Sequence, residues 1–366
     1  MYQFKLILSS RTLKCITIIS LMNKNNNFDF IRFLFALLVV ISHSYPLSGS
    51  NESSQWICQI TNGQIVLAQI GLSGFFIISG YFIFQSLERS KSILDYLKKR
   101  FLRLFPALSV VLLLSILLAP FVYEGKVSFL NNKEVYTYLP YNLSLYGFQS
   151  SIKGIFDTNS YHAINGSLWT IRYEFSLYIA LALLFFCKKQ IQLVLILTFV
   201  LFFILYNFYL SRFGGSSLFG LLGLHVLNLG TFFIAGSLCA CLQFEKIKNK
   251  GLLLGTSILI LVLAINFNYY DSAKHIIFPI VVLLIGFIPL PFISTFGKMG
   301  DMSYGIYIYS FPVQQTLMYF FKMDTYTLMF TSVLLSISFG YLSWHGIEKK
   351  ALKYKKFDFY TFSLLH

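Results

Sequence analysis

Long, almost uncharged segments recur along the whole chain, and they restrict the fold more than any other feature. A helix needs roughly 20 apolar residues to cross a bilayer, where only helices or closed barrels satisfy every backbone polar group. With 56% hydrophobic and 12% charged residues, the chain is too apolar for a water-soluble domain. We therefore predict an all-α, polytopic integral membrane protein with about ten transmembrane helices. The apolar segments lie at residues 30–47, 64–87, 104–123, 167–187, 190–210, 217–243, 252–270, 275–293, 302–321 and 326–345.

The distribution of basic residues predicts the orientation of these helices. When the amino terminus is placed inside, the inner loops and the tail carry 17 Lys and Arg residues, and the outer loops carry six. Because cytoplasmic loops are enriched in basic residues, both termini should be cytoplasmic. The same bias accounts for the net charge of +15, which would otherwise suggest a nucleic-acid partner. We expect membrane lipid around this chain and no nucleic acid.

Composition divides the chain into three regions. Residues 1–27 form a polar or peripheral amino-terminal segment, residues 28–348 a transmembrane domain, and residues 349–366 a basic cytoplasmic tail. The first 21 residues are only moderately apolar and lack a small-residue cleavage site, so they make a poor signal peptide. Met22 opens a polar MNKNNN run. We expect either that Met22 is the true start or that the residues before it form a peripheral segment.

The cysteines give no sign of a metal site. The sequence has five of them, without metal-ligand spacing, and only Cys58 falls in a predicted outer loop. We therefore expect no metal and no disulfide framework. The sequence does not indicate an oligomeric state.

The first apolar segment, FIRFLFALLVVISHSYPL, contains two ionisable residues, Arg32 and His43. They are eleven positions apart, so at roughly 100° per residue they share one helix face, roughly 16 Å apart along the axis. Ionisable groups at bilayer depth usually face a protein interior or a watery cavity and mark a functional site. Arg32 could instead reach the lipid headgroups, and His43 could be a hydrogen-bonded interior histidine. The shared face favours a functional role for both.

The fourth apolar segment opens with NGSLWTIRYEF, which contains Glu174. This carboxylate should lie a turn or two below the outer surface, close to the depth expected for His43. A carboxylate and an imidazole at matched depth are the components of a general acid/base pair. Arg172 could instead neutralise Glu174 in a structural ion pair, although helix positions two apart point to different faces.

The loop between the second and third apolar segments is strongly basic. It reads RSKSILDYLKKRFLRLFPAL over residues 89–108. Arg100 and Arg103 are three positions apart on a helix and share a face. They could anchor the helix at the inner membrane surface. Alternatively they could clamp phosphate, because guanidinium groups bind phosphate oxygens bidentately.

Two other segments carry packing or cavity signals. GLSGFFIISG at residues 71–80 spaces small residues for the close approach of two helices. Pro312 should kink the helix that contains it, so that the freed carbonyls and the side chains of Gln314 and Gln315 could line a cavity.

Six segments, taken together, resemble one known family. They are FDFIRFLFALLVVISH, GLSGFFIISGYF, RFLRLFP, SLWTIRYEFSLYI, MSYGIYIYSFPV and SWHGIEKKALK. In this order, over residues 28–355, they resemble the motifs of the membrane acyltransferase-3 family in its stand-alone form. Two positions depart from the pattern. Ser310 stands where many relatives have histidine, so no catalytic role is assigned there, and Lys350 replaces a common proline.

The resemblance implies a reaction and roles for the residues above. It implies transfer of an acyl group, usually acetyl from acetyl-CoA, to a sugar hydroxyl of a cell-surface glycan. Arg100 and Arg103 would hold the phosphates of CoA, with Arg32 in the same cradle. His43 would be the general base for the hydroxyl or be transiently acylated, and Glu174 would orient or charge it.

The resemblance also implies a location and an acceptor. The location would be the inner membrane of a bacterium, and the acceptor a polysaccharide such as lipopolysaccharide O-antigen, capsule or exopolysaccharide, or a lipid-linked sugar. A membrane glycan polymerase or flippase, or a small-molecule exporter, would also be polytopic and rich in Phe and Tyr. These classes need no CoA site, so CoA binding that depends on Arg100 and Arg103 distinguishes them.

Overall fold

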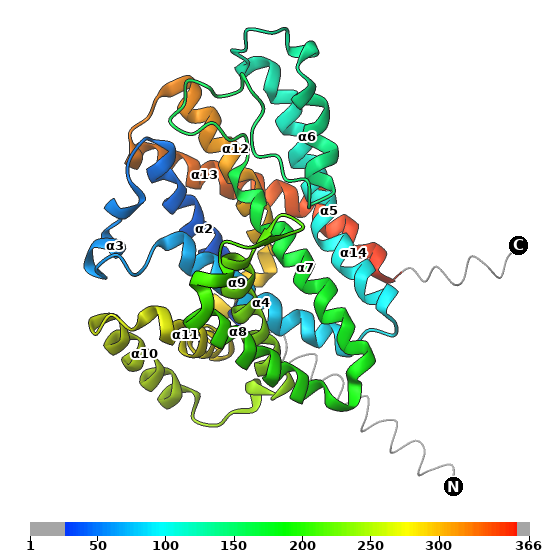
Figure 1. The fold of residues 1–366 in the computed structure, drawn as a ribbon, viewed down its shortest axis with the longest axis vertical. Helices are drawn as coiled ribbons and strands as arrows, with labels where there is room; N and C mark the ends of the chain where they lie inside the picture. Colours follow the sequence, from blue (N-terminus) through cyan, green and yellow to red (C-terminus); the bar gives the residue numbers. More distant parts are fainter. Residues whose placement is uncertain (1–25, 357–366) are drawn as a thin grey trace, which may run out of the picture.

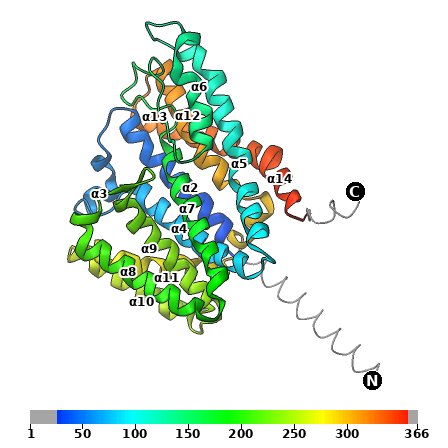
Figure 2. The same cartoon turned by 45° about the vertical axis from the view of Figure 1, so that its right-hand side comes forward.

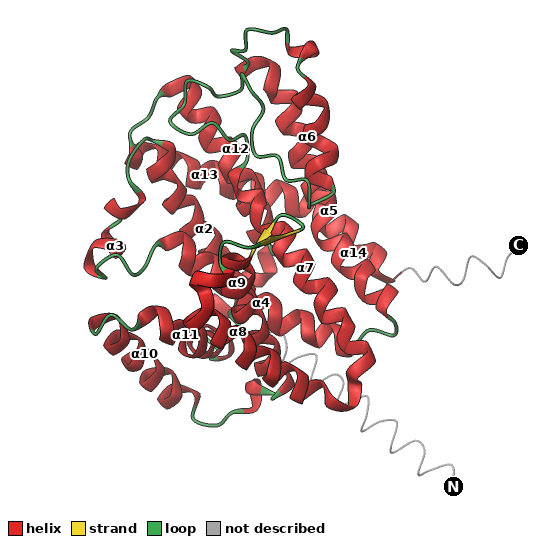
Figure 3. Cartoon of the chain, in the orientation of Figure 1, coloured by secondary structure: helices red, strands yellow, loops and turns green. Residues whose placement is uncertain are grey.

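The computed structural model describes residues 26–356. The expected start at Met22, the residues before it and the last part of the basic tail lie outside the described residues. Within the described range, the chain is helical or irregular apart from one antiparallel hairpin, β1 (Ser217–Leu218) with β2 (Leu221–Leu222) (Figure 3). The predicted all-α class is therefore confirmed.

Each predicted apolar segment holds a helix. These helices are α2 (Phe28–Leu47), α4 (Leu67–Glu88), α5 (Ile93–Leu118), α7 (Ile171–Ala182), α8 (Ile191–Phe213), α9 (Gly223–Cys241), α10 (Lys250–Asn266), α11 (Tyr270–Phe287), α12 (Ser303–Phe321) and α13 (Thr325–Ser343). Between them lie the shorter helices α3 (Trp56–Ile60), α6 (Lys133–Leu143) and α14 (Lys349–Lys353). Short 3₁₀ segments include η4 (Gly166–Thr170), η5 (Leu183–Gln190), η7 (Ile293–Met299) and η9 (Tyr354–Lys356), and η8 (Trp344–Glu348) is a π-helical turn.

Eight helical runs between residues 26 and 356 are long and apolar enough to cross a membrane. They are built on α2, α4, α5, α7, α8, α9, α11 and α13. Helix α10 is apolar but has only 17 residues, and α12, which carries two glutamines and several tyrosines, is not among the eight. The chain therefore has the architecture of a multi-pass membrane protein. Ten crossings and cytoplasmic termini stay predictions.

Helix α4 lies at the centre of the bundle because its glycines let two neighbours approach closely. A Cβ atom on Gly80 would lie 1.9 Å from the carbonyl oxygen of Phe233 on α9. A Cβ atom on Gly71 would lie 2.6 Å from the carbonyl oxygen of Phe35 on α2. The close-packing prediction for residues 71–80 is confirmed, since only glycine leaves room for these backbone contacts.

The glutamines of α12 hold the bundle together instead of lining a cavity. Gln314 is fully buried and donates hydrogen bonds to the carbonyl oxygen of Val40 and to Ser44 Oγ, both on α2. Gln315 is also fully buried and donates to the carbonyl oxygen of Ala163 at 2.5 Å. Neither lines the large cavity described below. The two amides instead link α12 by hydrogen bonds to α2 and to the segment that contains Ala163.

Two ends of the molecule can be followed in the ribbon. Helix α6 and the irregular chain around it stand at the top of Figures 1 and 2, and α10 lies at the bottom. After α13, the π-helical turn η8 continues the helical run into α14, and α14 and η9 pack beside α5 (Figures 1 and 2).

Ser92 fixes the start of α5 as an N-cap, accepting a hydrogen bond from Asp95 N at 3.1 Å.

Candidate active site

A cavity of about 480 Å³ lies where α2, α4, α5, α7 and α12 meet the carboxy-terminal turn. Its charged lining consists of six basic side chains and two carboxylates. A cavity with this excess of positive charge attracts anions. The charged lining residues are Arg32, Arg89, Lys99, Arg100, Arg103, Lys355, Glu174 and Asp301.

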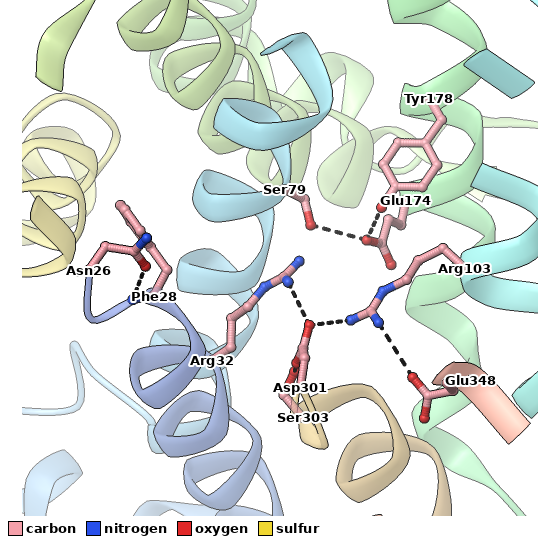
Figure 4. A network of polar contacts seen from close by, with 10 residues as sticks. All are labelled: Asn26, Phe28, Arg32, Ser79, Arg103, Glu174, Tyr178, Asp301, Ser303 and Glu348. Carbon is pink, nitrogen blue, oxygen red and sulfur yellow. Dashed lines mark hydrogen bonds and ion pairs between the residues drawn. The ribbon is translucent and has the colours of Figure 1, made fainter. Parts of the chain in front are cut away.

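Asp301 is the centre of an ion-pair network on the cavity wall (Figure 4). Arg32 Nη1 and Arg103 Nη2 both donate to Asp301 Oδ2, at 2.8 and 2.5 Å. Ser303 Oγ donates to the other oxygen at 2.5 Å, and Arg103 Nη1 lies 3.5 Å from Glu348 Oε2. Burial opposes ionisation of Asp301, but Arg103, Arg32 and the Ser303 hydrogen bond hold its pKa well below the usual range. Asp301 is therefore a carboxylate at any physiological pH.

Two local backbone features, a glycine turn and a π-helical turn, position the carboxylates of the ion-pair network. Gly300 has φ +101°, and a Cβ atom there would lie 2.0 Å from Trp344 Nε1, so the turn before Asp301 requires glycine. Trp344 begins the π-helical turn η8, at whose end Glu348 accepts a hydrogen bond from Ser343 Oγ at 3.0 Å. Such π turns often occur at functional sites. Here the turn brings Glu348 to Arg103.

Arg100 occupies a different environment from Arg103. It is 8% exposed, donates to Ser86 Oγ at 3.1 Å, and lies 5.8 Å from the ring centres of both Tyr96 and Tyr178. Among the described residues, no carboxylate pairs with it and its Nε has no hydrogen-bond partner. The two arginines therefore share the cavity, but only Arg103 is neutralised by protein carboxylates.

Glu174 faces the cavity from the first turn of α7. It accepts hydrogen bonds from Ser79 Oγ at 3.1 Å and from the hydroxyl of Tyr178 (Figure 4). Arg172 does not pair with it in the described part of the chain. The Arg172 guanidinium lies instead 5.2 and 5.3 Å from the ring centres of Phe148 and Tyr173. The two side chains diverge because they are two positions apart on one helix.

His43 lies beyond the end of the cavity that Tyr307 lines. Its half-buried ring packs edge-to-face on Phe311, with 5.4 Å between ring centres, and its Nδ1 has no hydrogen-bond partner among the described residues. Phe311 is one helical turn after Tyr307, which does line the cavity. The structure thus gathers Arg32, Arg100, Arg103 and Glu174 around one cavity, whereas His43 is neither a lining residue nor hydrogen-bonded to Glu174.

Several residues of the site were not singled out by the sequence. They are Ser79, Tyr178, Asp301, Glu348 and Lys355. A signal existed for the acids: the chain has only 14 Asp and Glu residues, so a carboxylate at the end of an apolar helix calls for a cationic partner. Ser79 belonged to a segment explained by packing. No local signal distinguishes Lys355 from the other lysines of the tail.

The fold and this site define a multi-pass membrane protein with a cation-lined cavity. The family described as "Acyltransferase domain" matches residues 25–345, so the chain belongs to this acyltransferase-3 family. The resemblance drawn from the six motifs is confirmed.

Two proteins of known name are similar to this chain in sequence. The chain is 29% identical to the O-acetyl transferase of Shigella phage Sf6 over 346 residues, which cover 90% of this chain and 97% of the relative. It is 28% identical to nodulation protein 10 of Rhizobium leguminosarum bv. viciae over 182 residues, which cover 43% of this chain and 44% of that protein. No solved structure matches the chain.

Proposed function

We propose that this protein transfers an acetyl group from acetyl-CoA to a hydroxyl of a cell-surface glycan at the inner membrane of a bacterium. The acceptor would be lipopolysaccharide O-antigen, capsule or exopolysaccharide, or a lipid-linked precursor of one of these. The observation that carries the proposal is the cation-rich cavity in a chain of the acyltransferase-3 family. The similarity to an O-acetyl transferase over almost the whole chain supports acetyl as the group transferred.

The cavity fits the donor. Its six basic residues lie at the end of the bundle that the positive-inside rule predicts to be cytoplasmic, where acyl-CoA is available. Arg100 presents a buried guanidinium with an unpartnered Nε, and its fork geometry suits phosphate oxygens. The cavity extends from these cations past Glu174 to Thr170 and Tyr307. A pantetheine arm on this path would point toward His43.

His43 would accept the proton of the acceptor hydroxyl. A neutral hydroxyl is a weak nucleophile near pH 7, so a base must remove its proton as the oxygen bonds to the acyl carbon and the carbon–sulfur bond breaks. The Nδ1 atom of His43 has no partner among the described residues, so it is available to a ligand. Its position beyond Tyr307 suits a hydroxyl that arrives from the outer side.

Glu174 would serve the donor side of the reaction. It is held by Ser79 and Tyr178 at the cavity and not by His43. Unlike Asp301, it forms no ion pair with a described residue. Its place between the cationic end and Tyr307 would put it beside the pantetheine arm and the departing thiol.

The direct test compares the ester content of surface glycan, by NMR or mass spectrometry, between cells with the wild-type protein and cells with His43→Ala. We expect an acetyl signal that disappears in the variant, with normal protein in the membrane and no effect of His162→Ala, a change at an exposed histidine. Ester in both samples would remove His43 from the chemistry. No ester in either would favour the polymerase, flippase or exporter classes.

A second test concerns Glu174. Removing a general acid or base costs roughly 10²–10⁴-fold in rate, so Glu174→Gln should lower kcat for acetyl transfer by about that factor. Arg172→Gln is the matched control, because the structure separates Arg172 from Glu174. Equal losses in both variants would contradict the separate placement of these residues.

A further inference from the structure

The cavity cations fall into two groups. In the first group, Arg32 and Arg103 are bound to Asp301, Arg103 is also bound to Glu348, and Lys99 is bound to Asp95, so the protein largely neutralises their charges. Arg89, Arg100 and Lys355 form no ion pair with a described carboxylate. A ligand anion would therefore meet its strongest unsatisfied charge at this second group and not at the Asp301 network.

Lys355 is the most unusual member of the second group. It is half-buried on η9, lines the cavity, and belongs to a segment that packs on α5. Burial, together with the nearby positive charges of Arg100, Arg103 and Lys99, lowers its pKa to about 8, and Asp301 acts in the opposite direction. An ammonium group in such surroundings is unfavourable unless an anion binds beside it.

The unpaired charges favour an anion larger than a diphosphate. Arg32 and Arg103 pair with Asp301, and Lys99 pairs with Asp95, so three lining cations have no described carboxylate partner: Arg89, Arg100 and Lys355. The diphosphate of CoA supplies about two negative charges, and a 3′-phosphate monoester supplies close to two more. A donor without the 3′-phosphate would leave about one of these three cations unmatched.

We propose that Lys355 and Arg89, two unpaired cations of the cavity lining, bind the 3′-phosphate of the donor, while Arg100 binds its diphosphate. Arg89 is the exposed C-cap that follows α4, whereas Lys355 lies on η9, so the two reach the cavity from different elements. This inference rests on the proposed use of acyl-CoA. It narrows the donor class to 3′-phosphorylated CoA thioesters and makes the carboxy-terminal segment part of the donor site.

The test uses the purified full chain in vesicles of uncharged phospholipid, with acetyl-CoA and 3′-dephospho-acetyl-CoA as donors. We expect kcat/KM of the wild type to favour acetyl-CoA by at least about tenfold, the effect of one charge-assisted hydrogen bond. Lys355→Gln should lose most of this preference by losing rate with acetyl-CoA only, and Lys355→Arg should retain it. Lys353→Gln, at an exposed lysine of α14 outside the cavity, is the matched control.

Three outcomes would overturn the inference. The wild type could use both donors equally. Lys355→Gln could lower both rates by the same factor, which would indicate a general structural effect. Activity could instead depend on added anionic phospholipid in a way that Lys355→Gln abolishes, which would assign the phosphate to a lipid headgroup.

A binding measurement separates this inference from the proposed function. If the wild type transfers acetyl from neither donor, the proposed function fails. Calorimetry then measures the binding of 3′,5′-ADP and 5′-ADP, and this comparison tests the 3′-phosphate site by itself. Tighter binding of 3′,5′-ADP that is lost in Lys355→Gln would support the site. Equal or absent binding of the two nucleotides would overturn it.

Discussion

At the residue scale, the site depends on which charges the protein neutralises itself. Asp301 accepts from two guanidiniums and one hydroxyl, so it fixes the positions of Arg32 and Arg103 and leaves Arg100 for a ligand. Sequence spacing treated Arg100 and Arg103 as one pair. The structure separates them by their surroundings: Arg100 lies between two tyrosine rings, whereas Arg103 meets carboxylates from distant segments of the chain.

Asp301→Asn should destabilise the fold. The substitution leaves two largely buried guanidiniums without their shared carboxylate, and breaking a buried ion pair costs about 3–5 kcal/mol. Thermal unfolding of the purified protein measures the loss. Asp324→Asn is the control, because Asp324 is an exposed N-cap of α13 and asparagine caps equally well. Equal unfolding midpoints for both variants would refute a structural role for the network.

Donor use should depend on pH through Lys355. Its pKa is about 8 in the free protein, and only the protonated form attracts phosphate. Therefore kcat/KM for acetyl-CoA should be highest below this pH and fall as pH rises through it, because this ratio reports ionisations of the free enzyme. In Lys355→Arg the charge persists, so the fall should move to higher pH. Superimposable pH profiles of the two proteins would contradict this assignment.

At the element scale, glycines of α4 decide how closely the central helices pack. Gly80→Ala should force α4 and α9 apart, since its Cβ would lie 1.9 Å from a backbone oxygen that no side-chain rotation can move. Overpacking of this kind costs typically about 1–3 kcal/mol, and a backbone clash belongs at the upper end. Gly255→Ala on α10 has nothing within 4 Å of the new atom and should be neutral or slightly stabilising. Unfolding of the two variants in parallel tests this difference.

At the scale of the whole molecule, the direction of the bundle decides whether the cavity meets the donor. The positive-inside rule predicts that α14 is cytoplasmic and that the loop containing Lys126 is outside. In a cysteine-free background, an impermeant maleimide should label Lys126→Cys in intact spheroplasts and Lys353→Cys only after permeabilisation. The reverse pattern would place the cavity mouth outside and contradict acyl-CoA as donor.

The sequence by itself determined the class of fold, the apolar helices and the family, because length and hydropathy decide what a bilayer accepts and six motifs recur in order. It also identified four residues that share the cavity. Only the tertiary structure decided how their charges are balanced. Asp301 and Glu348 are far from Arg32 and Arg103 in sequence, and Lys355 reaches the cavity because the segment after α13 packs along α5. Periodicity reports the face of one helix, but it cannot report which charges from distant segments meet there.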